Sequence, residues 1–353
     1  MPDRRIALAL AAAVFALSAA AFAAQEPPRP SGLVEEIDVA RLLVEARVFD
    51  ARGEVVRGLK ARDFVVRVDG RPAEILDADW TDGAAPFEPL AVGVADKGQN
   101  AADALGPRAG RLVVLFFQRR INITREAGLM RLAHLAQRYV DGLAPTDRVA
   151  VVVYDSRLSL LEDFTSDHAR VKKTIHDAVL PFERRAAGPG GPEPSLAAHW
   201  DEERAAQAGT CEAGLLAVAR GLEEIGGPKT LLFFGWGLGR YTANGTIDQP
   251  EFADARRTLV AAHAAVSVVD YREAETHSLE APMRALASET GGAYVKTDIS
   301  TDKALERAFA TASGHYLLTL RKPPLGPGVH RIEAELTAPK GRTVYTRGYY
   351  RSE

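Results

Sequence analysis

Cysteine is nearly absent from this sequence: Cys211 is the only one among 353 residues. A single cysteine excludes an internal disulfide framework, so the folded chain must depend on a sizeable hydrophobic core. Apolar residues make up 46% of the sequence and charged residues 26%, which is ordinary for a soluble globular protein. The formal net charge of −3 gives no reason to expect nucleic acid or an anionic membrane as a partner.

Long apolar runs are also scarce, and the one at the N-terminus is typical of a secretory signal peptide. MPDRR is a basic start, an Ala-rich apolar stretch follows it, and Ala21-Phe22-Ala23 matches an A-x-A cleavage site. The stretch is too short and too rich in Ala for a stable membrane span, although a single membrane anchor is the alternative. We therefore expect residues 1–23 to be a signal peptide and the mature protein to be periplasmic or extracellular, with no stable membrane span.

Motifs for catalysis and for nucleotide binding are missing. The eight histidines show no HExxH and no paired spacing typical of zinc ligands, and no GxSxG elbow is present. The segment Gly235–Gly239 lacks both the GxGxxG spacing of a dinucleotide site and the Lys-Ser/Thr ending of a P-loop. Cys211 begins an apolar helix pattern with no His nearby in sequence, which favours a structural role over a nucleophilic thiol. The sequence thus predicts a protein that is not an enzyme and takes no cofactor.

Strand patterns occupy both ends of the mature chain. After a Pro-rich linker at residues 24–38, residues 39–80 alternate as strands do, and Asp69-Gly70 predicts a hairpin turn with positive φ at both residues. Residues 81–110 shift to Gly, Ala, Pro and Asp, which predicts a second linker. Residues 315–350 show three more strand patterns without helices between them. Because neither set of strands buries much core alone, we expect both to build one antiparallel β-sandwich.

Residues 111–314 alternate between strand and helix patterns. Leu112–Phe117 is a continuous apolar run, as expected for a strand that is buried on both faces, and Leu158–Glu162 predicts an antiparallel edge. The alternation predicts an α/β fold, a doubly wound, mostly parallel, Rossmann-like sheet with helices on both faces. Residues 183–209 are long for a connection and rich in Pro and Gly, which predicts a mobile lid or a disordered segment. The other parallel strands are expected at Arg148–Tyr154, Lys229–Phe234, Val266–Tyr271 and Ala293–Lys296.

The ordered segments LVVLFF, DRVAVVVYDSRLSLLEDFTSD, KTLLFFGWG, VSVVDYR and ASETGGAYV resemble a von Willebrand factor type A (vWA) domain. The flanking stretches VFDARGEVVRGLKARDFVVRVDGRPAEI and HYLLTLRKP make the chain similar to the exported VWFA-related proteins of Acidobacteria. The resemblance runs from about Val39 to Tyr350. It implies a binding protein whose partner is held by the loops at the C-terminal ends of the parallel strands.

Domains of this family often bind Mg²⁺ at a metal-ion-dependent adhesion site (MIDAS). That site takes Asp-x-Ser-x-Ser at the tip of the first strand, a Thr before a middle helix and an Asp at the tip of the fourth strand. The matching positions here are Gln118, Arg120, Asn122, Thr210 and Trp236. A register shifted by one places Phe117, Arg119 and Ile121 at the first three positions instead. Mg²⁺ needs oxygen ligands with at least one or two carboxylates, and both carboxylates are missing in either register. The resemblance therefore implies a degenerate MIDAS without a metal.

The arginines at this strand tip suggest a replacement for the cation. We expect Arg119 or Arg120 to meet a carboxylate of an unidentified protein partner through a bidentate pair. Solvated arginines, or a pair between one of them and Asp270, are the alternatives. The other candidate contact residues are Asn122, Trp236, Leu238 and Tyr241.

Two further functions stay open at this point. One is a secreted hydrolase with residues 183–209 as a lid and a nucleophile and base near Cys211 or His199. The other is a structural envelope component without a specific ligand. The sequence does not indicate the oligomeric state.

Overall fold

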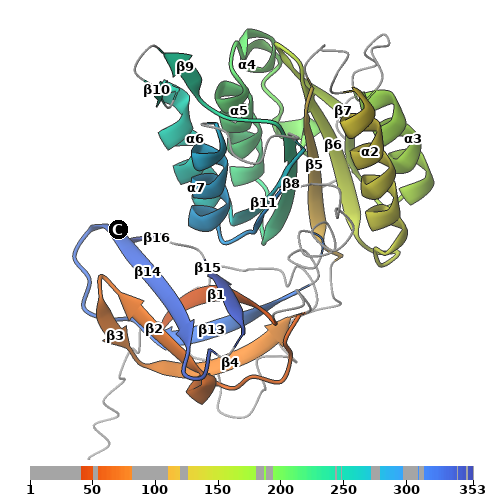
Figure 1. Ribbon diagram of the computed structural model, residues 1–353. Helices are drawn as coiled ribbons and strands as arrows, with labels where there is room; N and C mark the ends of the chain where they lie inside the picture. The colour runs from red at the N-terminus through yellow and green to blue at the C-terminus, as the bar shows by residue number, and fades with distance from the viewer. Residues whose placement is uncertain are drawn as a thin grey trace, which may run out of the picture. The chain divides into compact units, whose positions relative to one another are not determined.

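The computed structural model (Figure 1) describes an α/β unit and two antiparallel sheets. Residues 1–40, which hold the predicted signal peptide and the first linker, lie outside the described residues, as do residues 82–109 of the second linker. The described residues are 41–50, 55–81, 110–119, 126–179, 187, 194–242, 245–247, 249–271, 279–296, 309, 314–339, 341–346 and 349–352.

The central sheet of the α/β unit has six strands in the order β12-β11-β8-β5-β6-β7. When the six strands are numbered along the chain and read from β7, this is the 3-2-1-4-5-6 order of a doubly wound sheet. The edge strand β7 (Leu158–Thr165) runs antiparallel to β6, and the other pairings are parallel. The predicted fold class is confirmed. The parallel strands are β5 (Leu112–Gln118), β6 (Arg148–Tyr154), β8 (Lys229–Gly235), β11 (Ala264–Asp270) and β12 (Tyr294–Lys296).

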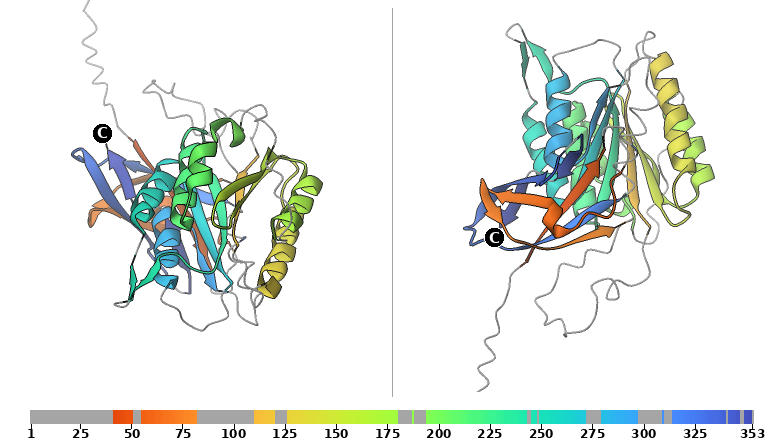
Figure 2. Two further views of the ribbon diagram at one scale, coloured as in Figure 1. Left: turned by 90° about the horizontal axis from the view of Figure 1, so that it is seen from above. Right: turned by 60° about the horizontal axis from the view of Figure 1, so that its bottom comes forward.

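Helices cover both faces of this sheet (Figure 2). One face packs against α5 (Cys211–Glu223), α6 (Pro250–Ala261) and α7 (Glu280–Thr290), and the other against α2 (Glu126–Asp141) and α3 (His168–Val179). Phe116 and Phe117 of β5 point to opposite faces, and each meets a phenylalanine of β8 with ring centroids 5.3 and 4.7 Å apart. Burial on both faces explains the unbroken apolar runs. None of the helices in the described ranges has the length and apolarity needed to cross a membrane.

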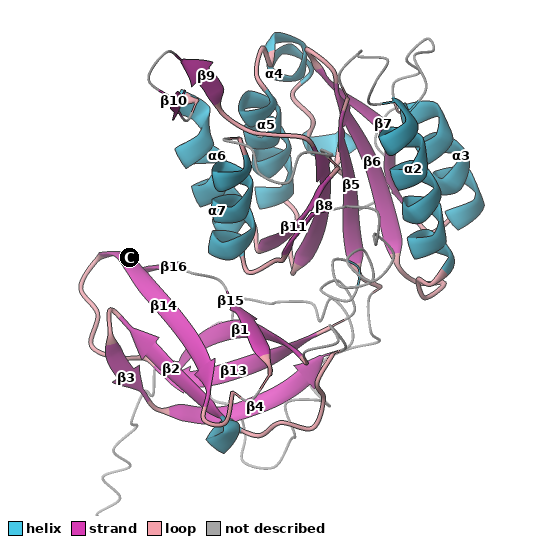
Figure 3. Cartoon of the chain, viewed as in Figure 1, coloured by secondary structure: helices cyan, strands magenta, loops and turns pink. Residues whose placement is uncertain are grey.

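Strands from both ends of the chain share two further sheets (Figure 3), in the orders β15-β1-β13-β4 and β16-β14-β2-β3. Their inner faces contribute to one core, as the predicted β-sandwich requires. Asp69 and Gly70 have φ of 50° and 75°, which confirms the predicted turn. The strands are β1 (Arg41–Phe49), β2 (Phe64–Val68), β3 (Arg71–Ala73), β4 (Ile75–Thr81), β13 (His315–Arg321), β14 (Gly328–Leu336), β15 (Thr343–Thr346) and β16 (Tyr349–Ser352), and a 3-10 turn spans Ala61–Asp63.

The described part of residues 183–209 is folded, contrary to the expectation of a mobile or disordered segment. It contains a 3-10 turn at Ala197–His199 and the helix α4 (Glu202–Gln207). Asp163 of β7 accepts hydrogen bonds from the Ser195 hydroxyl at 2.6 Å and from the Leu196 N–H at 2.7 Å. The Ala187 N–H donates to the carbonyl of Leu160 at 2.8 Å, also on β7. The segment therefore shields the free edge of the sheet, which would otherwise expose unpaired backbone groups.

A short hairpin that the sequence did not predict follows β8. Its strands are β9 (Arg240–Thr242) and β10 (Gly245–Ile247), which pair antiparallel and form a separate two-stranded sheet.

Candidate functional site

Gln118 ends β5 at the C-terminal edge of the sheet, and its side chain links β5 to the loop after β8. Its Nε2 donates to the carbonyl of Gly237 at 2.8 Å, and its Oε1 accepts from the Trp236 N–H at 3.0 Å. The Tyr271 hydroxyl donates to the backbone carbonyl of Gln118 at 2.6 Å. Gln118 is 3% exposed, so both functions of its amide are used within the chain. The position of the first MIDAS carboxylate is thus a buried cross-link between strand ends.

The loop Gly235–Gly239 has glycine where a side chain would not fit. A Cβ at Gly235 would lie 2.2 Å from a ring atom of Phe233, and a Cβ at Gly237, whose φ is +155°, would lie 2.7 Å from the Cβ of Leu279. Trp236 packs, partly buried, against the core on the α2–α3 face, whereas Leu238 is 1% exposed in the core on the opposite face. Close packing at the end of β8 therefore explains why glycines occupy these positions, and a phosphate-binding loop is not needed to explain them.

Arg119 forms an ion pair with Asp155, which follows β6 directly. Its Nη2 lies 2.5 Å from Oδ2 of Asp155, and the two side chains are 10% and 4% exposed. The Arg119 N–H also donates to the carbonyl of Tyr154 at 2.7 Å. The guanidinium is therefore held inside the chain and neutralises a buried carboxylate. Pairing of an arginine within the protein was one of the expected outcomes, but the carboxylate that binds Arg119 is Asp155.

A second polar network lies at the ends of β11 and β12. Asp270 is fully buried and accepts a hydrogen bond from the Tyr294 hydroxyl at 2.6 Å. Burial and this bond raise the pKa of Tyr294 well above its ordinary value. Glu280, in the first turn of α7, accepts from Nε of Arg284 at 2.7 Å and from Nζ of Lys296 at 3.3 Å. Burial opposes ionisation of Glu280, but these hydrogen bonds outweigh it and lower its pKa.

The N-terminus of α5 carries the residue that matches the MIDAS threonine. Thr210 is the N-cap of the helix, and its hydroxyl accepts from the Ala213 N–H at 3.1 Å. Glu212, 3% exposed, accepts from the Gly239 N–H and so ties the loop after β8 to the helix. Burial and the neighbouring Glu212 raise the pKa of the Cys211 thiol well above its usual value. A nucleophilic cysteine needs the opposite shift, so Cys211 has the environment of a core residue.

The donor set at this edge does not fit Mg²⁺. The positions of the two family carboxylates hold Gln118, whose amide is fully engaged, and Trp236. The nearby carboxylate of Asp155 is bound by a guanidinium. Within the described ranges, no group of three His, Cys, Asp or Glu side chains is arranged to hold a metal. An octahedral magnesium site needs one or two carboxylates and further oxygen ligands, so the residues present do not supply it.

The structure corrects two of the candidate contact residues. Leu238 is a core residue with no surface for a partner, and Arg119 is paired with Asp155. Trp236 keeps a partly exposed side chain. The side chain of Tyr241 is not described, although its backbone lies in β9. Arg120 and Asn122 lie outside the described residues, so their predicted roles stay predictions.

Sequence reasoning did not single out Asp155, Glu212 and Tyr271. A signal for Asp155 was present: β5 and β6 are parallel, and Gln118 lies beside Tyr154, so the residue after each strand also comes close to the other. No comparable sequence signal points to Glu212 or to Tyr271, because each contacts a segment that becomes its neighbour only through the fold.

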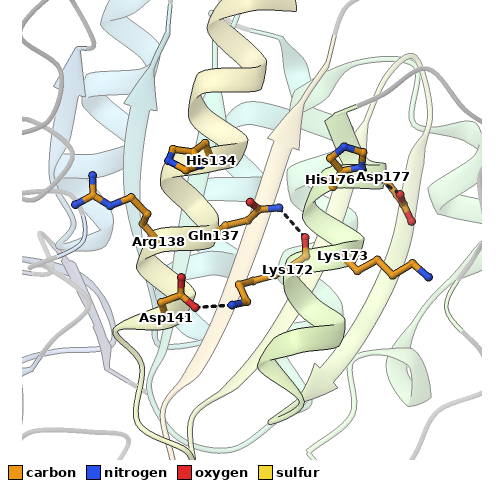
Figure 4. Close-up of a pocket in the computed structure, with 8 residues that line it drawn as sticks. All are labelled: His134, Gln137, Arg138, Asp141, Lys172, Lys173, His176 and Asp177. Atoms are coloured by element: carbon orange, nitrogen blue, oxygen red, sulfur yellow. Dashed lines mark hydrogen bonds and ion pairs between the residues drawn. The ribbon is translucent and has the colours of Figure 1, made fainter.

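A shallow groove between α2 and α3 gathers several charged side chains (Figure 4). Lys172 pairs with Asp141 at 2.6 Å, and Nε2 of Gln137 donates to the carbonyl of Lys172 at 2.9 Å. Arg138 and Lys173 point away from each other on opposite sides of the groove. The charged groups therefore do not converge on one ligand position, and this groove is not a candidate site.

No family model matches the chain, and no curated protein sequence matches it. Among solved structures, it is similar to a von Willebrand factor type A protein from Catenulispora acidiphila, with 10% identity, 88% of this chain and 72% of that chain covered, and a TM-score of 0.41. It is also similar to BatB from Bacteroides thetaiotaomicron, with 14% identity, 57% and 99% coverage, and a TM-score of 0.37. A third is proximal thread matrix protein 1 from the mussel byssus with a zinc-occupied MIDAS motif, with 14% identity, 61% and 49% coverage, and a TM-score of 0.36.

The α/β unit has a doubly wound sheet with one reversed edge strand and helices on both faces, as the resemblance of its sequence to a vWA domain implies. The resemblance to the Acidobacterial proteins remains a prediction from the sequence.

Proposed function

We propose that the protein is an exported, non-enzymatic binding protein that holds a protein partner at the C-terminal edge of its α/β sheet without a metal ion. The observation that carries the proposal is the internal pairing of the polar side chains at this edge. Gln118 binds the loop after β8, and Arg119 binds Asp155. These hydrogen bonds and this ion pair hold the edge in one conformation, so it presents a fixed surface to a partner.

Trp236 is the residue that we expect to contact the partner most closely. It is partly exposed, it follows the end of a central strand, and its two neighbours are glycines at positions too tightly packed for a larger side chain. Tryptophan is enriched among the residues that dominate binding energy at interfaces. An anchor whose backbone is already ordered loses little conformational freedom on binding, which favours affinity. Arg240, which is exposed, begins β9 four residues further along the chain.

The arginine hypothesis changes in one respect. Arg119 stabilises the edge by neutralising Asp155, and Arg120 is the arginine that we expect to meet a carboxylate of the partner. Export rests on the N-terminal sequence, which has the charge, the apolar stretch and the cleavage site of a signal peptide.

Capture of partners from the cell envelope of the source organism tests this function. The bait is the mature wild-type protein or Trp236→Ala, with Trp200→Ala as the matched control, because Trp200 is also partly buried but packs against the core on the other face. We expect at least one protein to bind wild type and Trp200→Ala, to be lost with Trp236→Ala, and to bind equally in EDTA. Identical captured proteins for all three baits would contradict the proposed site. A partner released by EDTA would contradict binding without a metal.

A further inference from the structure

We infer that Gln118 is a positioning residue for Trp236, so that the partner site is formed before the partner arrives. The inference rests on the proposed function, in which Trp236 contacts the partner. It adds that the site has no cation-dependent switch, because the Gln118 side chain of β5 holds the end of β8 in place.

The two hydrogen bonds of Gln118 lie on either side of Trp236 along the chain. Oε1 accepts from the N–H of Trp236 itself, and Nε2 donates to the carbonyl of Gly237, the next residue. A planar amide is the group that supplies an acceptor and a donor side by side, whereas a carboxylate supplies acceptors only. The two bonds therefore hold the Gly235–Trp236 and Gly237–Leu238 peptides, which limits the backbone conformation between them and, with it, the direction in which the Trp236 side chain leaves the backbone.

Contacts of its own backbone and side chain fix the position of Gln118. The Tyr271 hydroxyl binds its backbone carbonyl at 2.6 Å, and β5 pairs with strands on both sides. Space around the amide is tight, since a Cβ at Gly235 would lie 2.9 Å from its Oε1. The loop after β8 is fixed from a second direction by Glu212, which accepts from the Gly239 N–H. The Gln118 amide and the Glu212 carboxylate thus both hold the backbone of Gly235–Gly239 in place.

Gln118→Glu separates hydrogen bonding from side-chain size, because glutamate is nearly isosteric with glutamine. Above the pKa of the new carboxyl group, a carboxylate oxygen faces the carbonyl of Gly237 where an N–H donor belongs. Below it, the protonated acid supplies one O–H donor and one acceptor and restores both bonds. Gln118→Met is the companion variant, since it keeps a similar volume and offers neither bond at any pH.

The readout is the fluorescence of Trp236 in a chain where it is the only tryptophan. The sequence has three, so the background carries Trp80→Phe and Trp200→Phe. Emission maximum and acrylamide quenching are recorded from pH 4 to 8, with far-UV circular dichroism to verify folding and without any partner. The titratable groups on the described elements around the tip include Arg119, Tyr154 and Asp155 at β5 and β6, Cys211 and Glu212 on α5, Asp270 and Tyr271 at β11, Glu280 on α7 and His134 on α2. The parent chain with Gln118 intact controls for their titration.

We expect the Gln118→Glu chain to match the parent at low pH and to show a red-shifted, more quenchable Trp236 at high pH. Gln118→Met should differ from the parent throughout, and Mg²⁺ should change the parent at no pH. If either folded variant matches the parent over the whole range, the inference is wrong. If Gln118→Met does not fold, the pH dependence of Gln118→Glu decides the matter alone.

The positioning role and the partner site can fail separately. A Trp236 signal that follows Gln118, together with unchanged capture by Trp236→Ala, upholds positioning and contradicts the proposed function. Loss of capture by Trp236→Ala, together with a signal independent of Gln118, upholds the partner site and contradicts positioning.

Discussion

Replacement of Arg119 by methionine should destabilise the protein strongly, because it removes a guanidinium that neutralises the buried Asp155 carboxylate. The two side chains are 10% and 4% exposed and meet at 2.5 Å, so water cannot solvate the remaining carboxylate unless the strand ends separate. Loss of one partner of a buried ion pair costs about 3–5 kcal/mol. Methionine retains most of the apolar stem, so lost packing contributes little to this figure.

The matched control is Lys172→Met, which breaks the pair between Lys172 and Asp141. That pair is nearly as short, at 2.6 Å, but its side chains are 36% and 58% exposed. Exposed pairs are worth about 0–1 kcal/mol, so the control should change stability by no more than this. The comparison isolates burial as the cause.

Urea unfolding followed by circular dichroism measures both variants, and Arg119→Met with Asp155→Asn completes a double-mutant cycle. We expect the double variant to recover about 1–3 kcal/mol relative to the sum of the single changes, as coupled residues do. Equal, small effects of Arg119→Met and Lys172→Met, or additive effects in the cycle, would refute the argument that Arg119 neutralises a buried carboxylate.

Three further predictions concern other parts of the α/β unit. Asp163→Ala removes the acceptor for the Ser195 hydroxyl and the Leu196 N–H and should lower the free energy of unfolding by about 2–3 kcal/mol. Amide hydrogen exchange should become faster in residues 194–199 alone, and unchanged exchange there would show that other contacts hold the segment. Burial lowers the pKa of Lys229 to about 8, so the folded chain loses this proton at a lower pH than the unfolded chain does. The free energy of unfolding of the wild type, relative to that of Lys229→Met, should therefore rise as the pH rises above about 8. A difference between the two proteins that stays flat or falls between pH 7 and 10 would contradict this prediction. Cys211 should react with a thiol reagent at pH 8 only as fast as the protein opens, and rapid labelling of the native protein would disprove its burial.

Features that depend on local sequence could be predicted, because their causes lie within a few residues. The apolar run of β5 follows from burial on both faces, and Asp69-Gly70 follows from the positive φ that a tight turn requires. The end of β5 at Gln118 was also evident, since the apolar pattern stops there. The joining of N- and C-terminal strands in one β-sandwich followed from a simple requirement, a core that neither set could build alone.

Pairings between distant segments could not be predicted in the same way. The partners of the Gln118 amide are Trp236 and Gly237, more than a hundred residues away, and no periodicity in either segment indicates the contact. Leu238 was expected to contact the partner, but the turn directs it into the core. The segment after α3 was expected to be mobile or disordered from its composition, yet contacts with the edge strand, among them the hydrogen bonds to the Asp163 carboxylate, order part of it.

The central claim is that the C-terminal edge of the sheet is held by its own side chains and needs no divalent cation. Thermal unfolding of the purified protein in EDTA and in excess Mg²⁺ or Mn²⁺ tests it directly, because a cation present at 100 times its dissociation constant would stabilise the fold by about 2.7 kcal/mol. We predict the same Tm in all three conditions. A large rise in Tm with either cation, abolished by Gln118→Ala or by Thr210→Ala, would contradict the claim and restore a metal to this site.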